Sequence, residues 1–294
     1  MMRSETDIKN LVVNFAEEDE RIRAVVLNGS RANPDMEPDK FQDFDVVFIV
    51  TDFESFISDH DWINVFGEKM IWQLPDEMNF GEATENDNKN ISFGYLMIFK
   101  DGNRIDLTIF PAAHFAKSFK IDSLTVVWLD KDKLFPDAIV SNDSDCHVKQ
   151  PNEKDYFDTC NEFWWVSTYV GKGLLRNEIT YAKEMLDTVV RPMFMKMMAW
   201  KIGIENNFSV STGKAGKLMP LYLSEDDYTR LLKTYSDADI ENNWKALFIM
   251  TELFRDASTR ISHELKFKQN EEKQMNVIDY LKRLYKHRNL NTGD

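Results

Sequence analysis

Cysteine is scarce in this sequence, and histidine shows no pattern. Only Cys146 and Cys160 occur among 294 residues, and they form no CxxC pair. This usage favours two reduced thiols in a cytosolic protein over a disulfide. The histidines have no metal-ligand spacing, which disfavours a zinc site. They are His60, His114, His147, His263 and His287.

Long hydrophobic runs are also missing. The first 20 residues turn acidic after a short apolar run at 11–13 and contain no hydrophobic region of a signal peptide. No apolar run approaches the roughly 20 residues that a membrane helix needs. These absences predict a cytoplasmic protein with no membrane partner.

Positive charge is in short supply. The chain has 36 basic and 50 acidic residues and a net charge of −14. Because neutralisation of phosphates dominates nucleic-acid binding, this balance disfavours a DNA or RNA partner. The same field would attract and steer a small polycation.

Neither of the familiar glycine-rich phosphate motifs, GxGxxG and GxxxxGK[ST], is present. The remaining candidate is Gly29-Ser30-Arg31, which follows the apolar run 23–28. A glycine lets the backbone approach a ligand closely, and free N–H groups together with the Ser30 hydroxyl can bind phosphate oxygens. The same residues also fit an ordinary turn between a strand and a helix.

What the sequence does contain is enough apolar residues for two packed domains. Hydrophobic residues make up 43% of the chain and aromatic residues 13%. Apolar runs typical of strands occur only before residue 140, and helical periodicity dominates after 150. The pair Asp101-Gly102 between two apolar runs indicates an antiparallel hairpin. We therefore predict an α+β protein, with a mixed, largely antiparallel sheet in domain 1–140 and an all-helical domain in 150–294.

Individual elements follow from hydrophobic period and turn residues. The expected strands are 23–28, 44–50, 69–74, 91–100, 103–110 and 125–129, and 82–90 is expected to be a loop. Helical character is expected over 5–20, 53–66, 154–171, 177–202, 226–236, 240–264 and 271–287. Pro192 should kink or split the helix in which it lies.

Three aspartates form the strongest candidate site. Asp43 and Asp45 are two residues apart at the start of a predicted strand, so their side chains point to the same face, whereas Phe44 points to the other. Like charges held together favour a cation between them, and oxygen-only ligands suit Mg²⁺. Asp106 lies in the apolar run 103–110, although Asp is depleted in strands. If the two strands are neighbours, the three carboxylates could hold two Mg²⁺ ions for nucleotidyl transfer. Solvated carboxylates at a strand end are the alternative.

These residues support a family resemblance. A GS pair, a DxD on a strand twelve residues later and a further lone Asp resemble the nucleotidyltransferase superfamily that includes DNA polymerase β. The longer segments GSRANPDMEPDKFQDFDVVFIV, RIDLTIFP, CNEFWWVSTYVGKGLLRNEI and VRPMFMKMMAW resemble the aminoglycoside 6-adenylyltransferases. The resemblance implies transfer of AMP from ATP to a hydroxyl of streptomycin, with antibiotic resistance as the consequence. It makes Asp43 and Asp45 metal ligands, and it leaves Asp106 as either a third ligand or the general base.

The second domain would then hold the acceptor, a cationic aminoglycoside. Carboxylates pair with guanidinium groups, and aromatic faces hold cations. The predicted acceptor-binding residues are Glu162, Trp165, Tyr169, Glu178, Glu184 and Asp187. Lys214 and Lys217 lie in a basic loop and are candidates for binding the ATP triphosphate together with Gly29, Ser30 and Arg31. For each of these residues, packing in a core or exposure on a helix surface is the alternative.

Two other functions compete with this interpretation. The same fold could adenylylate another acceptor, such as a protein side chain. A catalytically inactive nucleotide-binding module is the other possibility, but the three retained aspartates speak against it.

Overall fold

The computed structural model describes residues 2–37, 39–78 and 91–291. The chain divides into two compact units, Met1–Asp145 and Cys146–Asp294. The predicted loop 82–90 lies outside the described residues. Within the described part, no helix is both long enough and apolar enough to cross a membrane. Cys146 and Cys160 are not joined by a disulfide.

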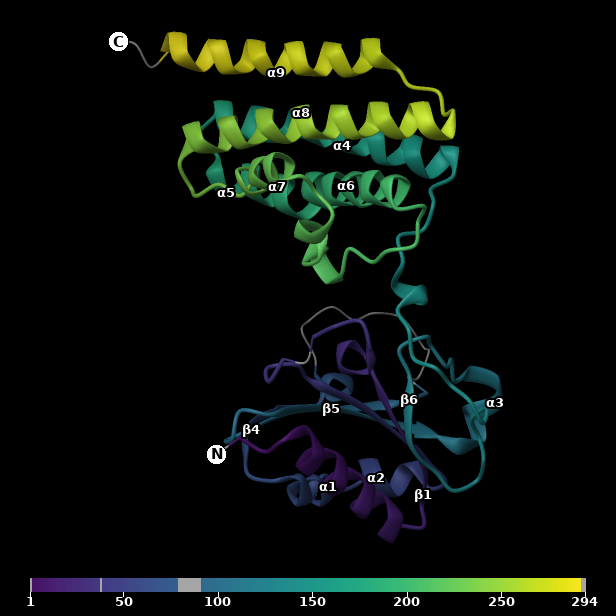
Figure 1. Ribbon diagram of the computed structural model, residues 1–294. Coiled ribbons are helices and arrows are strands. Elements are labelled where there is room, and N and C mark those ends of the chain that lie inside the picture. Colours follow the sequence, from purple (N-terminus) through teal and green to yellow (C-terminus); the bar gives the residue numbers. More distant parts are fainter. Residues whose placement is uncertain (1, 38, 79–90, 292–294) are drawn as a thin grey trace. The chain divides into compact units, whose positions relative to one another are not determined.

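Unit 1 is built on a six-stranded mixed sheet (Figure 1). The strand order is β3(Lys69–Gln73), β4(Phe93–Phe99), β5(Arg104–Pro111), β2(Phe44–Val50), β1(Ile22–Asn28) and β6(Val126–Asp130). The β2–β5 pair is parallel and the other four pairs are antiparallel. The predicted α+β class is confirmed, and so is the hairpin at Asp101-Gly102, where Gly102 has φ +90°.

Helices cover one face of the sheet. The helices α1(Glu5–Glu18) and α2(Phe53–Ile57) lie on the same side in Figure 1, together with the 3₁₀ segment Asp61–Phe66. Alternate residues of the strands, such as Phe44, Val46, Ile105 and Leu107, are buried beneath them. The helical character predicted over 53–66 is thus divided between α2 and the 3₁₀ segment.

The opposite face of the sheet carries a smaller apolar cluster. Ala24, Val26, Val47 and Ile49 pack there with Phe135, with Phe115 of α3(Phe115–Ser118) and with Phe119, which follows α3. The cluster covers β1 and the C-terminal half of β2. It leaves the residues that begin β2 and β5 half-buried on this face, and these residues include Asp45 and Asp106.

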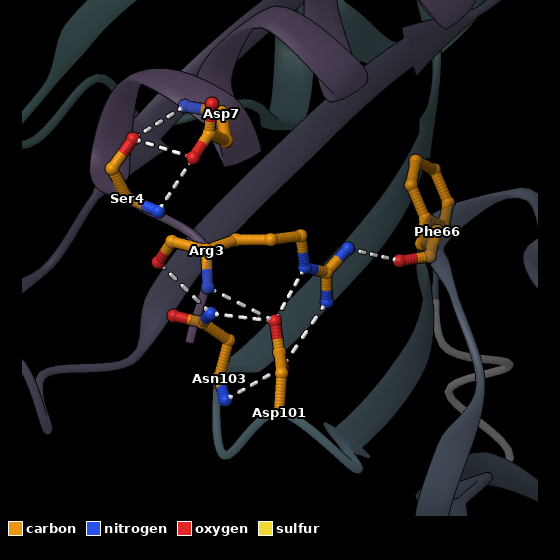
Figure 2. A network of polar contacts seen from close by, with 6 residues as sticks. All are labelled: Arg3, Ser4, Asp7, Phe66, Asp101 and Asn103. Carbon is orange, nitrogen blue, oxygen red and sulfur yellow. Dashed lines mark hydrogen bonds and ion pairs between the residues drawn. The ribbon is translucent and has the colours of Figure 1, made fainter. Parts of the chain in front are cut away.

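The N-terminal segment is fastened to the β4–β5 turn (Figure 2). Ser4 and Asp7 form a reciprocal capping box at the start of α1. The Arg3 guanidinium donates to Asp101 from Nε at 2.6 Å and to the Phe66 carbonyl from Nη1 at 2.5 Å. Asn103 Nδ2 donates to the Arg3 carbonyl at 3.2 Å and to Asp101 Oδ2 at 3.0 Å. This network joins the segment before α1 to the β4–β5 turn, directly before Arg104 and Asp106 on β5.

Among its described residues, unit 2 contains helices joined by loops and no strands. Its helices are α4(Glu153–Leu175), α5(Ile179–Met185), α6(Arg191–Glu205), α7(Glu225–Leu232), α8(Ile240–Leu265) and α9(Glu271–Asn291). Its core is aromatic: Phe163 of α4 stacks on Phe254 of α8 with ring centroids 3.6 Å apart, and the Trp164 ring meets Phe254 edge-on. All five predicted helical segments of this unit are present.

Pro192 divides the longest predicted segment of unit 2. Residues Leu186–Val190 form a π-helical turn between α5 and α6, and Pro192 lies in the first turn of α6. A proline has no N–H to donate to the preceding turn and its ring crowds the carbonyl four residues back. The π turn accommodates this change in the hydrogen-bond ladder.

Candidate active site

Two of the predicted aspartates lie side by side. The parallel pairing of β2 with β5 places Asp45 directly opposite Asp106. Both side chains are half-buried, whereas their neighbours Phe44 and Ile105 are buried in the core on the other face. Alternation along each strand therefore turns both carboxylates toward the same face of the sheet.

Asp43 and Arg104 complete the cluster. Arg104 begins β5 and binds Asp106 through two parallel hydrogen bonds, from Nε to Oδ1 and from Nη2 to Oδ2, each 2.7 Å long. Its Nη1 lies 3.5 Å from Asp43 Oδ2. One guanidinium group thus pairs with two of the three carboxylates.

The electrostatics of the cluster reflect this crowding. Burial raises the pKa of Asp43; the Asp106 charge adds to the rise, and the Arg104 and Arg31 charges oppose it. The hydrogen bonds to Asp106 raise the pKa of Arg104, with further support from the charges of Asp43 and Asp45. Arg104 is therefore the counter-cation of this carboxylate group.

Gly29 brings the end of β1 against the cluster. Asn28 pairs with Asp45 across the β1–β2 ladder, so the backbone of Gly29 passes beside the Asp45 side chain. Ser30 follows at the start of a 3₁₀ turn, Ser30–Ala32. Among the described residues the Ser30 hydroxyl has no hydrogen-bond partner. The hydroxyl is therefore available to a ligand next to the carboxylates.

Arg31 has a different environment from the one its predicted role suggests. Its side chain is 7% exposed, and Nη1 lies 2.9 Å from Glu5 Oε2. The guanidinium group stacks on the Phe44 ring at 3.9 Å and donates to the Gln42 carbonyl at 2.6 Å. These contacts position the loop that carries Asp43, and direct contact of Arg31 with a nucleotide stays a prediction.

The donor set suits a hard divalent cation. Asp43, Asp45 and Asp106 offer only carboxylate oxygens, which are the donors that Mg²⁺ prefers. Within the described part of the chain, no three acidic, histidine or cysteine side chains are already gathered around one point as metal ligands. Both oxygens of Asp106 are bonded to Arg104 instead. The ligand chemistry fits Mg²⁺, but a metal would have to compete with this arginine.

Lys214 and Lys217 lie in unit 2, on a tight loop. Gly213, Ala215 and Gly216 all have positive φ, between 55° and 78°, and the loop is closed by backbone bonds such as Leu218 N to Thr212 O at 2.9 Å. Both lysine side chains are exposed. The loop therefore presents two cations to solvent from a fixed backbone.

Comparison with known proteins identifies the family. The family model described as "Streptomycin adenylyltransferase" matches residues 2–284. The chain belongs to the streptomycin adenylyltransferase family. Similar relatives are all named aminoglycoside 6-adenylyltransferase. They come from Bacillus subtilis (41% identical, 91% of this chain and 93% of the relative), Campylobacter jejuni (40%, 90% and 91%) and Staphylococcus aureus (35%, 89% and 92%). A crystal structure of the Bacillus subtilis aminoglycoside 6-adenyltransferase is 35% identical, covers 97% of this chain and 99% of that chain, and has a TM-score of 0.47.

Membership in the streptomycin adenylyltransferase family confirms several expectations from the sequence. The chain is a nucleotidyltransferase enzyme, and an adenylyltransferase implies ATP as the donor. The site residues are an independent matter. The structure shows which of them lie together, and their roles remain proposals.

Among the predicted acceptor residues, Trp165 and Tyr169 form a pair on α4. The Trp165 ring is 59% exposed, and its Nε1 donates to the Tyr169 hydroxyl at 2.7 Å. The Lys172 ammonium lies 5.8 Å from the centre of the Tyr169 ring. Trp164 and Val170 of the same helix, by contrast, are buried core residues. An indole exposed to this degree is available to a ligand.

The four predicted acidic residues differ in their surroundings. Glu162 and Glu184 are exposed, and neither makes an ion pair with another described residue. Glu178 faces Arg176 at 3.9 Å. Asp187 is paired twice, with Lys183 Nζ at 3.1 Å and with Arg191 Nε at 2.9 Å. Its carboxylate therefore already balances two cations within the helical unit.

Arg104 is the residue that sequence reasoning did not include in the site. Its alternation with Asp106 and Thr108 along β5 was visible, because the three occupy every second position. What the sequence did not reveal is that the Arg104 side chain extends along its own strand and bonds to Asp106. An arginine two residues from a predicted metal ligand, on the same strand face, is the signal that could have identified it.

Proposed function

We propose that this chain transfers AMP from ATP to a hydroxyl group of streptomycin and releases pyrophosphate. The observation that carries the proposal is the register of β2 and β5, which sets Asp45 beside Asp106 in a member of the streptomycin adenylyltransferase family. The relatives at 40–41% identity are named for 6-adenylylation, and modification of the drug would confer resistance. Since ATP and reduced thiols are found there, we place the protein in the cytoplasm.

The carboxylates of unit 1 would form the catalytic centre. Asp43, Asp45 and Asp106 would hold Mg²⁺, two ions in the fullest arrangement, which when bound would neutralise the triphosphate and lower the pKa of the acceptor hydroxyl. Asp106 is either a third ligand or the base that takes the hydroxyl proton. Its bidentate pairing with Arg104 fixes the orientation of the Asp106 carboxylate beside Asp45.

The donor phosphates would be bound beside the carboxylates of unit 1. The backbone after Gly29 and the Ser30 hydroxyl lie beside Asp45 and can donate to phosphate oxygens. Lys214 and Lys217 would supply positive charge from their loop. Arg31 would act by positioning the Asp43 loop, or by direct contact as first predicted.

The acceptor would be bound by unit 2. Streptomycin is cationic, and the net charge of −14 attracts it. The exposed Trp165 indole beside Tyr169 would pack on the sugar, and the carboxylates of Glu162, Glu178, Glu184 and Asp187 would pair with its guanidinium groups. Among these, Glu162 and Glu184 have the exposed carboxylates with no ion pair in the described residues.

Trp165→Ala tests the acceptor site. We expect the KM for streptomycin to rise about tenfold while the KM for ATP is unchanged, because stacking on an aromatic ring contributes about 1–2 kcal/mol. Phe157→Ala is the matched control, since Phe157 is an aromatic residue 55% exposed on the same helix. Equal effects of the two substitutions would argue against an acceptor contact at Trp165.

Pyrophosphate release from Mg–ATP tests the substrate. It should be stimulated by streptomycin and much less by spectinomycin or kanamycin. If streptomycin gives no stimulation while adenylyl groups are incorporated into protein, the enzyme adenylylates a protein side chain instead.

A further inference from the structure

Arg104 occupies the position at the carboxylate cluster where a cation is needed. It is the first residue of β5, and its side chain is 38% exposed. Its Nε and Nη2 donate hydrogen bonds to Asp106, whose side chain is 20% exposed. Its Nη1 lies 3.5 Å from Asp43 Oδ2. The guanidinium group therefore contacts two of the three carboxylates, Asp106 and Asp43.

The charge balance shows why such a cation is required. Asp45 and Asp106 are directly opposite one another on neighbouring strands, and Asp43 is two residues before Asp45. Three ionised carboxylates at this spacing repel one another unless positive charge lies among them. Arg31 is close enough to influence Asp43, but its side chain is engaged with Glu5 and with backbone carbonyls. Arg104, by contrast, directs its guanidinium group to the side chains of Asp106 and Asp43.

We propose that Arg104 is an internal substitute for a divalent cation. In the metal-free protein it holds Asp106 and Asp43 together. On loading it is displaced from Asp106, so it sets the metal concentration at which the site fills. The inference deepens the proposed function and rests on its assignment of these aspartates to metal binding. It assigns Arg104 a competing role, not that of a metal ligand or a proton carrier.

A residue that competes with the metal and a residue that orients its ligands predict opposite changes in metal affinity. If Arg104 competes with the metal, its removal raises metal affinity and weakens the metal-free fold. If Arg104 only orients Asp106 for the metal, its removal lowers metal affinity. The sign of the change therefore separates the two roles.

The experiment compares wild type with Arg104→Ala and Arg104→Lys by Mn²⁺ titration, with free Mn²⁺ followed by electron paramagnetic resonance. We expect Arg104→Ala to bind Mn²⁺ about tenfold more tightly, because one positive charge leaves the site. Arg104→Lys should lie nearer to wild type, since it keeps the charge and loses the planar fork. Circular dichroism spectra establish that both variants are folded.

Thermal unfolding in EDTA and in MgCl₂ provides a second readout, with Arg23→Ala as the matched control. Arg23 also bonds a carboxylate with two guanidinium nitrogens, but its partner Asp132 lies at the other end of β1. Arg104→Ala should lower Tm in EDTA and show a larger rise with Mg²⁺ than wild type. Arg23→Ala should lower Tm equally in both buffers.

The outcomes separate this inference from the proposed function. Unchanged or weaker Mn²⁺ binding by Arg104→Ala, with normal binding by wild type, overturns the inference alone. Absence of Mn²⁺ binding in both proteins overturns the inference together with the metal assignment of the aspartates.

Discussion

Gly29 lies so close to Asp45 that a Cβ atom on the glycine would be 2.1 Å from Asp45 Oδ2. The glycine also has φ +73°, a conformation that residues with a side chain rarely adopt. The end of β1 is therefore fitted to the carboxylate on β2. Asp45 in turn lies opposite Asp106 in the β2–β5 ladder.

Gly29→Ala should abolish most adenylyl transfer, because the new methyl group must displace the Asp45 carboxylate or the backbone beside it. We also expect a loss of about 1–3 kcal/mol in the free energy of unfolding from the strained backbone. Gly102→Ala is the control. Its φ is +90°, but the nearest atom to its added Cβ is Met2 Cε at 3.9 Å. This control should lose stability and keep its specific activity, and equal activity in the two folded variants would contradict the account.

Asp45→Asn and Asp106→Asn should each lower kcat by several orders of magnitude while the protein stays folded. Loss of one charge from a repelling cluster relieves repulsion, so Tm in EDTA should not fall for Asp45→Asn. Asp132→Asn, which removes an exposed carboxylate paired with Arg23, should keep its activity. Mg²⁺-dependent ATP binding then distinguishes the roles of Asp106: binding retained by Asp106→Asn indicates the base, and binding lost indicates a metal ligand.

The catalytic strands were predictable because their signals are local. The apolar run 103–110 predicted a strand that contains Asp106, and the Asp-Gly pair predicted the β4–β5 hairpin. The pairing of β5 with β2 joins residues about 60 positions apart, and no local pattern specifies it. The sequence analysis could only state that the three carboxylates would meet if these two strands were neighbours. The structure confirms that the strands pair.

Arg31 and Arg104 show the limit of reading a site from sequence. A basic residue next to Gly29-Ser30 suggests phosphate binding, yet the Arg31 guanidinium is buried against Phe44 and backbone carbonyls. Arg104 looked like one more polar residue on a strand face, yet it bonds the cluster directly. Which arginine reaches the carboxylates depends on the side-chain conformations and on how β1, β2 and β5 are arranged. Residue spacing in the sequence specifies neither.

Asp101 should make stability depend on pH. Burial raises the pKa of its carboxyl, but the bonds from Arg3 and Asn103 outweigh burial and hold the pKa well below its usual range. A carboxyl with a lowered folded-state pKa contributes stability above its unfolded pKa of about 3.9, and this contribution is lost as pH falls toward the folded value. Asp101→Asn should therefore cost about 2 kcal/mol near neutral pH and progressively less in acid. Urea unfolding at several pH values measures this, and a constant difference would contradict it.

Asp187→Asn tests whether this residue is primarily structural. Arg191 is 8% exposed, and it donates to Thr234 and stacks on Tyr235 as well as pairing with Asp187. Loss of the carboxylate should cost about 1–3 kcal/mol of unfolding free energy, because a buried cation loses a partner. Glu184→Gln, which lies one turn away and makes no ion pair among the described residues, should change stability by less than about 0.5 kcal/mol. If Asp187→Asn is as stable as wild type but raises the KM for streptomycin, its role is acceptor binding instead.

Mass analysis of streptomycin, after incubation with Mg–ATP and either wild type or Asp45→Asn, tests the proposed reaction directly. Wild type should add one adenylyl group to the drug and release one pyrophosphate per product, whereas folded Asp45→Asn should add none. Streptomycin left unmodified by folded wild type, or modified equally by both proteins, would contradict the proposed function.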